Sequence, residues 1–263
     1  MMDPPSAYLN GNYVNGGFIM NKKFHLNAET LPGFIKKAEK TILRPKTLYK
    51  WYDIVNGVSV KRQNGTTQTM WAVASNTFRG FHRIQKGCPG ASIVFRNYFV
   101  SNKHRLLTEI LSAKNSTELH HVEKRVCTDI RPKLSNIRQG SLDSYGRIRK
   151  PVDLYFQNLI CMAQELDRSR VNLVPYLFLA LDSQMFSDPN VFTDEELRAF
   201  HLSRRSTYKD VTDEKMYIQL QDILSKKATQ LSNRDAKFYR IYFDMLWNNR
   251  HQNWGSNFFE TNP

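Results

Sequence analysis

Hydrophobic and polar residues alternate with a helical period along most of the chain. In residues 29–43 the apolar positions recur at spacings of three and four, and Pro45 ends the pattern. Residues 93–113 and 117–127 also follow a helical pattern, and the first of these stretches is interrupted near its middle. These patterns predict a chain that is mainly α-helical.

The second half of the chain also follows helical patterns. Pro151 suits the first position of a helix, and Thr193 with Glu196 forms a capping box ahead of a further helix. Residues 173–186 are almost all apolar, which is typical of a helix that is buried in the core. We therefore expect a second helical region in residues 151–248.

A β-hairpin interrupts the helices of the first half. β-Branched residues lie on both sides of Asn64 and Gly65, and this dipeptide favours the positive φ angles of a type I′ turn. The pattern predicts a hairpin that carries Lys61 and Arg62.

A basic helix is expected directly after the hairpin. Ser75 or Asn76 can cap its start. Its basic residues recur at spacings of three and four, which would align them on one helical face; they are Arg79, His82, Arg83 and Lys86.

Composition limits the class of protein. The 263 residues, 41% of them hydrophobic, suffice for one large core or two smaller ones. No apolar run approaches the roughly 20 residues that cross a bilayer, and the first ten residues lack the pattern of a signal peptide. Three widely spaced cysteines argue against a disulfide framework and a structural zinc site. We expect an intracellular protein with reduced thiols.

Positive charge is concentrated in the first part of the chain. Residues 1–150 contain 25 Lys and Arg against 9 Asp and Glu, whereas residues 151–263 contain 13 against 15. Residues 44–105 hold 11 basic side chains and one acidic side chain. Such a density repels itself unless an anion lies against it, and nucleic acid is the obvious anion. A solvated basic face is the alternative, although such faces normally mix both signs.

Aromatic residues alternate with these basic residues, among them Tyr49, Trp51, Tyr52, Trp71 and Phe78. Single-stranded nucleic acid needs cations along its phosphates and flat rings against its bases, with stacking worth roughly 1–3 kcal/mol per base. Many of these rings must belong to the core. The remainder favour an interface for single-stranded nucleic acid.

Signatures of catalysis are weak. The chain has no glycine-rich phosphate loop, no nucleophile elbow and no zinc-protease motif. His120, His121 and Glu123 suggest a metal site, but adjacent histidines on a helix point in different directions, so surface histidines are the better explanation.

Three residues are the nearest candidates for a two-metal nuclease: Asp194, Asp213 and Lys215. Acidic residues at the start of a helix stabilise its dipole, and this role explains both aspartates better.

The order of several segments is distinctive: FIKKAEK, the hairpin GVSVKR and TFRGFHRI in the first half, then LYFQNLICMAQEL, VPYLFLALDSQMFS and KFYRIYFDMLW. This order resembles the nucleocapsid proteins of segmented negative-strand RNA viruses, the bunyavirus group, with tospoviruses and orthobunyaviruses most similar. The chain departs from that pattern at Gly80 and Phe81, where the family more often has another basic residue and a leucine. The resemblance covers most of the chain and rests on order and pattern.

The resemblance implies a mainly α protein of two helical lobes, with a small β-hairpin in the first lobe, a basic groove between the lobes and an arm at each end. The polar, basic segment 131–150 is expected to be the hinge. The expected divisions are an arm in residues 1–27, a basic lobe in 28–130, a second lobe in 151–248 and an arm in 249–263.

Basic residues of the hairpin, the following helix, the neighbouring segments and the hinge are expected to contact RNA: Lys50, Lys61, Arg62, Arg79, His82, Arg83, Lys86, Arg96, Lys103, Arg105, Arg147, Arg149, Lys150, Arg168 and Arg170. Arg168 and Arg170 are included on position alone. Apolar residues of the arms are expected to dock on neighbouring protomers: Tyr13, Phe18, Ile19, Trp254, Phe258 and Phe259.

These observations predict a non-enzymatic, sequence-tolerant protein that coats single-stranded RNA, assembles into a ring or filament and encapsidates a viral genome. It would need no metal or cofactor, would meet a viral polymerase, would not insert into membranes, and would occur in the virion and the host cytoplasm. The main alternative is a metal-dependent nuclease or another nucleic-acid-processing enzyme. A protein that binds an anionic membrane surface ranks below both.

Overall fold

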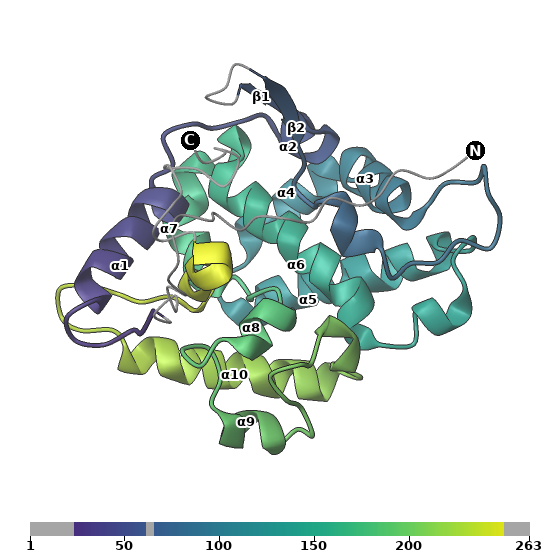
Figure 1. Ribbon diagram of the computed structural model, residues 1–263. Helices are drawn as coiled ribbons and strands as arrows, with labels where there is room; N and C mark the ends of the chain where they lie inside the picture. The colour runs from purple at the N-terminus through teal and green to yellow at the C-terminus, as the bar shows by residue number, and fades with distance from the viewer. Residues whose placement is uncertain (1–23, 62–65, 250–263) are drawn as a thin grey trace, which may run out of the picture.

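The computed structural model describes residues 24–61 and 66–249, and this part of the chain is mainly helical (Figure 1). Its described residues contain one sheet, a pair of antiparallel strands. The expected fold class, mainly α with a small hairpin, is therefore confirmed. No helix among the described residues is long and apolar enough to cross a membrane.

The elements of the first half are α1 (Leu31–Ala38), which continues as the π-helix Glu39–Leu43, α2 (Trp51–Asn56), β1 (Val58–Lys61), β2 (Thr67–Met70), α3 (Ala91–Ser101), α4 (Lys103–Ser112) and α5 (Ser116–Ile130). The second half contains α6 (Tyr145–Met162), α7 (Arg170–Leu173), α8 (Ser183–Ser187), α9 (Asp194–Arg198) and α10 (Glu214–Gln230). Short 3₁₀ helices lie between or after these elements: Ser75–Phe78, Arg131–Lys133, Gln139–Ser141, Gln164–Ser169, Val174–Tyr176, Tyr208–Asp210 and Arg240–Asn249.

Helix α6 is the centre of the core. Nearly all of its side chains are buried, and α2, α5 and α10 pack against it. Figure 1 shows it crossing the middle of the molecule, above α10. Elements from both halves of the chain therefore pack on one helix. The burial of apolar surface, worth about 25 cal/mol per Å², stabilises this packing.

Several expected elements are confirmed. A helix spans residues 31–43, and the interruption expected in residues 93–113 is the break between α3 and α4 at Asn102. Thr193 and Glu196 form the capping box of α9, in which each side chain accepts a hydrogen bond from the other residue's amide, at 3.2 and 2.7 Å. The hairpin pairs Val58 with Met70, and its turn lies outside the described residues.

The segment expected to be a hinge is folded against the core. Leu134, Ile137 and Leu142 are buried, and residues 145–150 are the first turns of α6. One hydrophobic cluster joins residues from before and after this segment. The division into two lobes stays a prediction.

Helix α6 begins six residues earlier than expected, so the prediction that Pro151 occupies its first position is wrong. The amides of Tyr145 and Gly146 donate to the carbonyl oxygens of Thr212 and Val211, at 3.1 and 3.0 Å. These bonds satisfy the first turn of the helix from another part of the chain. A Cβ atom at Gly146 would overlap a backbone carbonyl of residue 208, so only glycine permits this approach.

The prediction of one buried helix in residues 173–186 is also wrong. The segment is buried, but a 3₁₀ turn follows α7 and the chain then runs extended until α8 begins. Pro175 has no amide hydrogen to donate within a helix. The extended backbone therefore needs other hydrogen-bond partners in the core.

Two side chains from later in the chain supply those partners. The Gln221 amide accepts from Leu179 N at 3.1 Å and donates to Leu179 O at 2.7 Å. Arg240 Nε donates to Leu177 O at 3.0 Å. Gln221 on α10 and Arg240 on the last 3₁₀ helix thus stabilise a buried segment without regular secondary structure, which its own sequence does not predict.

Candidate nucleic-acid interface

A pocket of about 430 Å³ lies where segments from both halves of the chain meet. Its walls come from the end of β2 and the residues after it, the middle of α6, the start of α8, and the 3₁₀ helix Arg240–Asn249. Three aromatic side chains line it: Trp71, Tyr208 and Trp247. Its volume falls in the range of about 300–1,000 Å³ typical of pockets for small ligands. We call it the Trp71 pocket.

Cations stack on two of these rings. The Arg96 guanidinium carbon lies 4.0 Å from the centre of the Trp71 ring, and Lys150 Nζ lies 4.9 Å from the centre of the Tyr208 ring. Such cation–π contacts orient both partners. Trp71 remains 37% exposed, so a ring surface and a positive charge meet at the edge of the pocket.

A second group of cations lies beside Tyr208. Arg147 Nη1 donates to the carbonyl oxygen of Gly80 at 2.6 Å. A Cβ atom at Gly80 would lie 2.9 Å from the Tyr208 hydroxyl and 3.5 Å from Lys209 Cε. The absence of a side chain at Gly80 therefore allows Arg147 and Lys209 to approach the hydroxyl end of Tyr208, a residue that lines the pocket.

The interior of the pocket carries little positive charge. Lys150 Nζ lies 3.2 Å from a carboxylate oxygen of Asp182, and Trp247 Nε1 donates to the same oxygen at 3.3 Å. Asp244 also lines the pocket. Carboxylates repel phosphate, so the interior suits a neutral, flat group and the cations at the edge suit phosphates.

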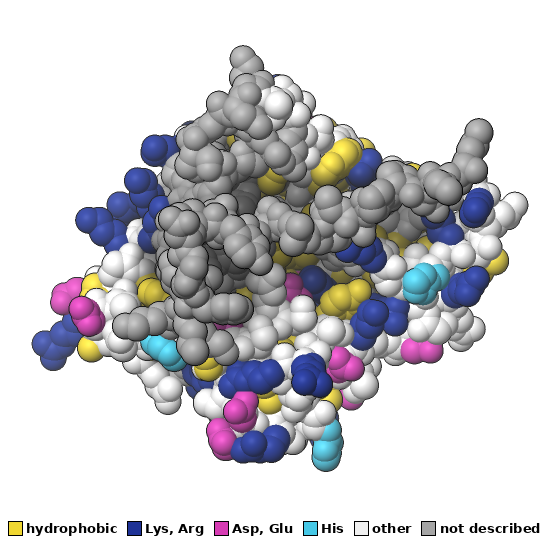
Figure 2. Space-filling model, in the orientation of Figure 1, with side chains coloured by type: hydrophobic (Ala, Val, Ile, Leu, Met, Phe, Trp, Pro, Cys, Tyr) yellow, Lys and Arg dark blue, Asp and Glu magenta, His cyan; other side chains and the backbone are white. Residues whose placement is uncertain are grey.

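Charge on the molecular surface is unevenly distributed. In Figure 2, Lys and Arg side chains are scattered over the right-hand part of the face with few carboxylates between them and gather again at the left edge, whereas the two signs mix near α9 at the lower edge. A surface with separated charge attracts an anionic polymer more strongly than one with mixed charge.

The basic helix expected in residues 75–86 does not form, and this prediction is wrong. The 3₁₀ helix Ser75–Phe78 is followed by irregular chain. Phe78 and Phe81 both pack on Phe95, with ring centres 5.4 and 6.1 Å apart. Arg83 then forms a β-bridge with Ile137. Core packing and this bridge stabilise the irregular conformation of the segment over a helix.

The four basic side chains of this segment are nevertheless exposed: Arg79, His82, Arg83 and Lys86. They do not share one helical face. Arg79 is closest in sequence to the Trp71 pocket, because Asn76 and Thr77 line its wall.

Two other predicted RNA contacts, Lys50 and Arg168, are not among the residues that line the pocket. Lys50 and Arg168 are exposed. Lys61 ends β1, but its side chain and the whole of Arg62 lie outside the described residues. The predicted arm residues also lie outside them: Tyr13, Phe18, Ile19, Trp254, Phe258 and Phe259.

Like Lys150 in the pocket, two predicted contacts that do not line it are paired with carboxylates. Lys103 Nζ lies 2.6 Å from Glu165, and Arg105 lies 2.9 Å from Asp129. A cation that already has an acidic partner gains less from a phosphate, because the phosphate must compete with the carboxylate.

The structure corrects the prediction for Arg149 and Arg170, which are 0% and 3% exposed. Arg149 pairs with Glu123 and, at 2.6 Å, with Asp153, while Arg170 lies 2.7 Å from Asp167. Both guanidinium groups are held inside the protein, where a phosphate cannot reach them. Their positive charges are paired with carboxylates of the protein itself.

A buried polar cluster surrounds Arg149. The hydroxyl of Tyr217 donates to Asp153 at 3.0 Å, and the Tyr217 ring centre lies 4.7 Å from the guanidinium carbon. Burial raises the pKa of Asp153 to about 8, although Arg149 lowers it. Arg149 is therefore the basic partner of two buried carboxyl groups, Asp153 and Glu123, whose burial disfavours their charged forms.

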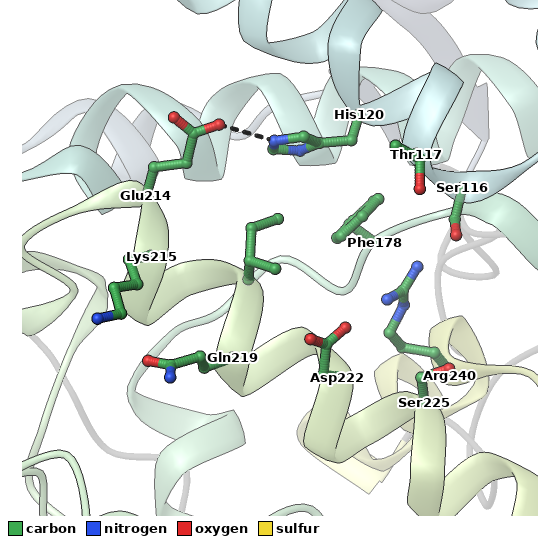
Figure 3. A pocket seen from close by; sticks show the side chains of 11 residues that line it. Ser116, Thr117, His120, Phe178, Glu214, Lys215, Gln219, Asp222, Ser225 and Arg240 are labelled. Carbon is green, nitrogen blue, oxygen red and sulfur yellow. Dashed lines mark hydrogen bonds and ion pairs between the residues drawn. The ribbon is translucent and has the colours of Figure 1, made fainter.

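His120 joins this cluster to a second pocket of about 530 Å³ at the start of α5 and α10 (Figure 3). It is 6% exposed, so the interpretation of His120 as a surface histidine is wrong. Its Nε2 lies 3.0 Å from Glu214 and its Nδ1 lies 3.3 Å from Arg149. Burial and Arg149 lower its pKa to about 4, although Glu214 raises it.

The shifted pKa of His120 predicts a loss of stability in acid. In the unfolded chain His120 is protonated with the ordinary pKa of 6.5, whereas in the folded chain it stays neutral until the pH falls to about 4. As the pH falls from 6.5 to 4, this histidine should lower the free energy of unfolding by about 3 kcal/mol. Urea denaturation of His120→Gln should show a weaker pH dependence over this window. The exposed neighbour provides the control, because His121→Gln should behave like the parent; equal slopes for all three would contradict the assignment.

The nuclease candidates have structural partners. Asp194 lies 2.6 Å from Arg204, and Asp213 caps α10 by accepting from Met216 N at 2.9 Å. Lys215 lies at the edge of the second pocket in Figure 3. In residues 24–61 and 66–249, no three His, Cys, Asp or Glu side chains form a group that could hold a metal ion.

No family model, curated protein or solved structure matches this chain. The resemblance to viral nucleocapsid proteins therefore stays a prediction.

Sequence reasoning singled out Trp71, Arg96, Arg147 and Lys150 but missed the rest of the pocket. The missed residues come from four separate parts of the chain: Gln157, Asn158, Asp182, Tyr208, Lys209 and Trp247. No spacing in the sequence relates them. Only the packing of α6 against the segments on either side brings them together.

Proposed function

We propose that the chain is a non-enzymatic protein that binds and coats single-stranded RNA with little dependence on sequence. The Trp71 pocket is the observation that carries this proposal. It combines aromatic surface with an interior that is poor in positive charge, and cations lie at its edge. A single strand presents bases and phosphates that match these two environments.

A duplex fits this arrangement poorly. Its bases are stacked and paired, so a ring in a pocket cannot reach a base face unless the base is unstacked. The strong excess of basic residues in the first 150 residues adds a contribution that does not depend on sequence, because phosphate contacts release counterions.

The wider function that we propose is encapsidation of a viral RNA genome. In this proposal the terminal arms dock on neighbouring copies, the assembly is a ring or a filament, and a viral polymerase meets the coated RNA. The assembly would occur in the virion and the host cytoplasm. The resemblance in segment order and the distribution of charge support this wider proposal.

Binding of labelled RNA measured by fluorescence anisotropy tests the central claim. The protein should bind a single strand more tightly than a duplex of the same sequence, and the logarithm of affinity should fall with the logarithm of salt with a slope of about −0.7 per phosphate contacted. Preference for the duplex would contradict the proposal. Incubation with Mg²⁺ or Mn²⁺ should leave the RNA intact on a gel, and cleavage would favour the nuclease alternative.

Removal of two exposed cations, Lys209 next to Tyr208 and Arg79 two residues after the lining residue Thr77, should weaken binding to all sequences about equally. Both Arg79 and Lys209 are exposed, so the double variant Arg79→Ala, Lys209→Ala should fold like the parent. Its salt slope should be smaller by about 1.4 if each residue contacts one phosphate. Lys226→Ala, an exposed lysine on α10, is the matched control and should leave the slope unchanged. A loss confined to one sequence would indicate base readout by these residues instead.

A further inference from the structure

We infer that the Trp71 pocket receives one nucleobase and prefers a base with an exocyclic amino group over uracil. This inference rests on the proposed function, because it assigns a ligand to the same pocket. The hydrogen-bonding groups of the pocket wall carry it, and one of them is an unsatisfied buried acceptor.

Gln157 is the first of these groups. It lines the pocket and is 1% exposed. Its carbonyl oxygen Oε1 is buried and has no hydrogen-bond partner among the described residues. Buried polar atoms in folded proteins are nearly always satisfied, so an unsatisfied one beside a cavity indicates a partner that the cavity can admit. A carbonyl oxygen requires an N–H or O–H donor.

Both amide hydrogens of the neighbouring residue, Asn158, are already used. Asn158 Nδ2 donates to Ala72 O and to Leu154 O, each at 2.8 Å. Both of its amide hydrogens are therefore used within the protein, and its remaining capacity is that of an acceptor.

Two donors of the wall are directed at a protein carboxylate. Lys150 Nζ and Trp247 Nε1 both bind Asp182, at 3.2 and 3.3 Å. Gln157 Oε1, by contrast, is a buried acceptor without a partner among the described residues. This position of the wall is complementary to a ligand group that donates.

The bases differ in this respect. Adenine, cytosine and guanine each carry an amino group, whereas uracil has carbonyl oxygens at the corresponding positions and donates only through its ring N–H. A uracil carbonyl next to Gln157 Oε1 would place two acceptors against each other. The aromatic rings of the pocket can contact the face of any base. In this inference the rings provide affinity for all bases, and the Gln157 amide provides the preference among them.

Oligocytidine and oligouridine of equal length are the matched probes, because both are pyrimidines of similar size and differ in one amino group. At pH 8, anisotropy titrations should show that the protein binds oligocytidine about 3- to 10-fold more tightly, the effect of one neutral hydrogen bond. Oligo(N4,N4-dimethylcytidine), which lacks the amino hydrogens, should bind like oligouridine. This comparison needs no variant and is independent of any folding defect.

Gln157→Met tests the residue itself, because methionine has a similar length and no carbonyl oxygen. The preference for oligocytidine should disappear in this variant, while Gln230→Met, at an exposed position on α10, should retain it. Equal affinity of the parent for both oligomers would overturn the inference and leave the proposed function standing. Failure to bind either oligomer would contradict the proposed function.

Discussion

Replacement of Arg149 by methionine is expected to lower the free energy of unfolding by about 3–5 kcal/mol. The side chain is 0% exposed and is the partner of both Glu123 and Asp153. Without the guanidinium, two carboxyl groups remain buried and uncompensated, and the fold must protonate them or admit water. Urea denaturation followed by circular dichroism measures the loss.

The control for Arg149→Met is Arg168→Met, which makes the same change at an exposed position and should cost little. A triple variant with Arg149→Met, Glu123→Gln and Asp153→Asn removes the charges together and should recover part of the loss. A loss below about 1 kcal/mol in the single variant would show that the buried pairs contribute little to stability.

Trp71→Ala is expected to weaken binding of single-stranded RNA about 5- to 150-fold, which corresponds to roughly 1–3 kcal/mol for one stacked base. The ring is 37% exposed and lies under Arg96, so its removal takes away a stacking surface and leaves the cation without an orienting partner. Stability should change less than affinity, because the side chain is not part of the buried core. Anisotropy titration at fixed salt measures the effect.

Tyr52→Ala is the matched control for the tryptophan variant. Tyr52 is 41% exposed and has Lys103 Nζ 4.5 Å from its ring centre, so it repeats the pairing of ring and cation outside the pocket. It should change affinity less than about 3-fold, since its cation is already paired with a carboxylate. Equal losses in both variants would indicate that RNA follows a general aromatic surface.

Patterns in the sequence predicted those elements that are stabilised by residues close to them in the sequence. The capping box at Thr193 and the helix in residues 31–43 depend on neighbours within a few residues, and both are present. The basic helix in residues 75–86 had an equally good local pattern. It is absent because Phe78 and Phe81 gain more from packing on Phe95 than the segment gains from helical hydrogen bonds.

Burial separates side chains that look alike in the sequence. Arg147 and Arg149 are two residues apart in a basic stretch, yet the first lies beside the pocket and the second is fully buried. Successive positions of a helix face different directions, and the sequence alone did not show where α6 begins. Knowledge of the true start at Tyr145 would have placed the two arginines on different faces.

The pocket depended on packing between remote segments. Trp71, Gln157 and Trp247 come from positions that share no spacing or motif. Charge and aromatic content drew attention to Trp71, which lines the pocket, but nothing in the sequence near Gln157 or Trp247 distinguishes them from core residues. A composition-based argument can therefore suggest the kind of ligand without locating the cavity that would hold it.

The extended segment in the core has a consequence for how the chain is made. Its backbone at Leu177 and Leu179 is hydrogen-bonded by Gln221 and Arg240, which leave the ribosome only when most of the protein has been synthesised. Until then this apolar stretch has no partners for its buried amides and carbonyls. The centre of the protein can therefore reach its final hydrogen bonding only after residues 221 and 240 have been synthesised.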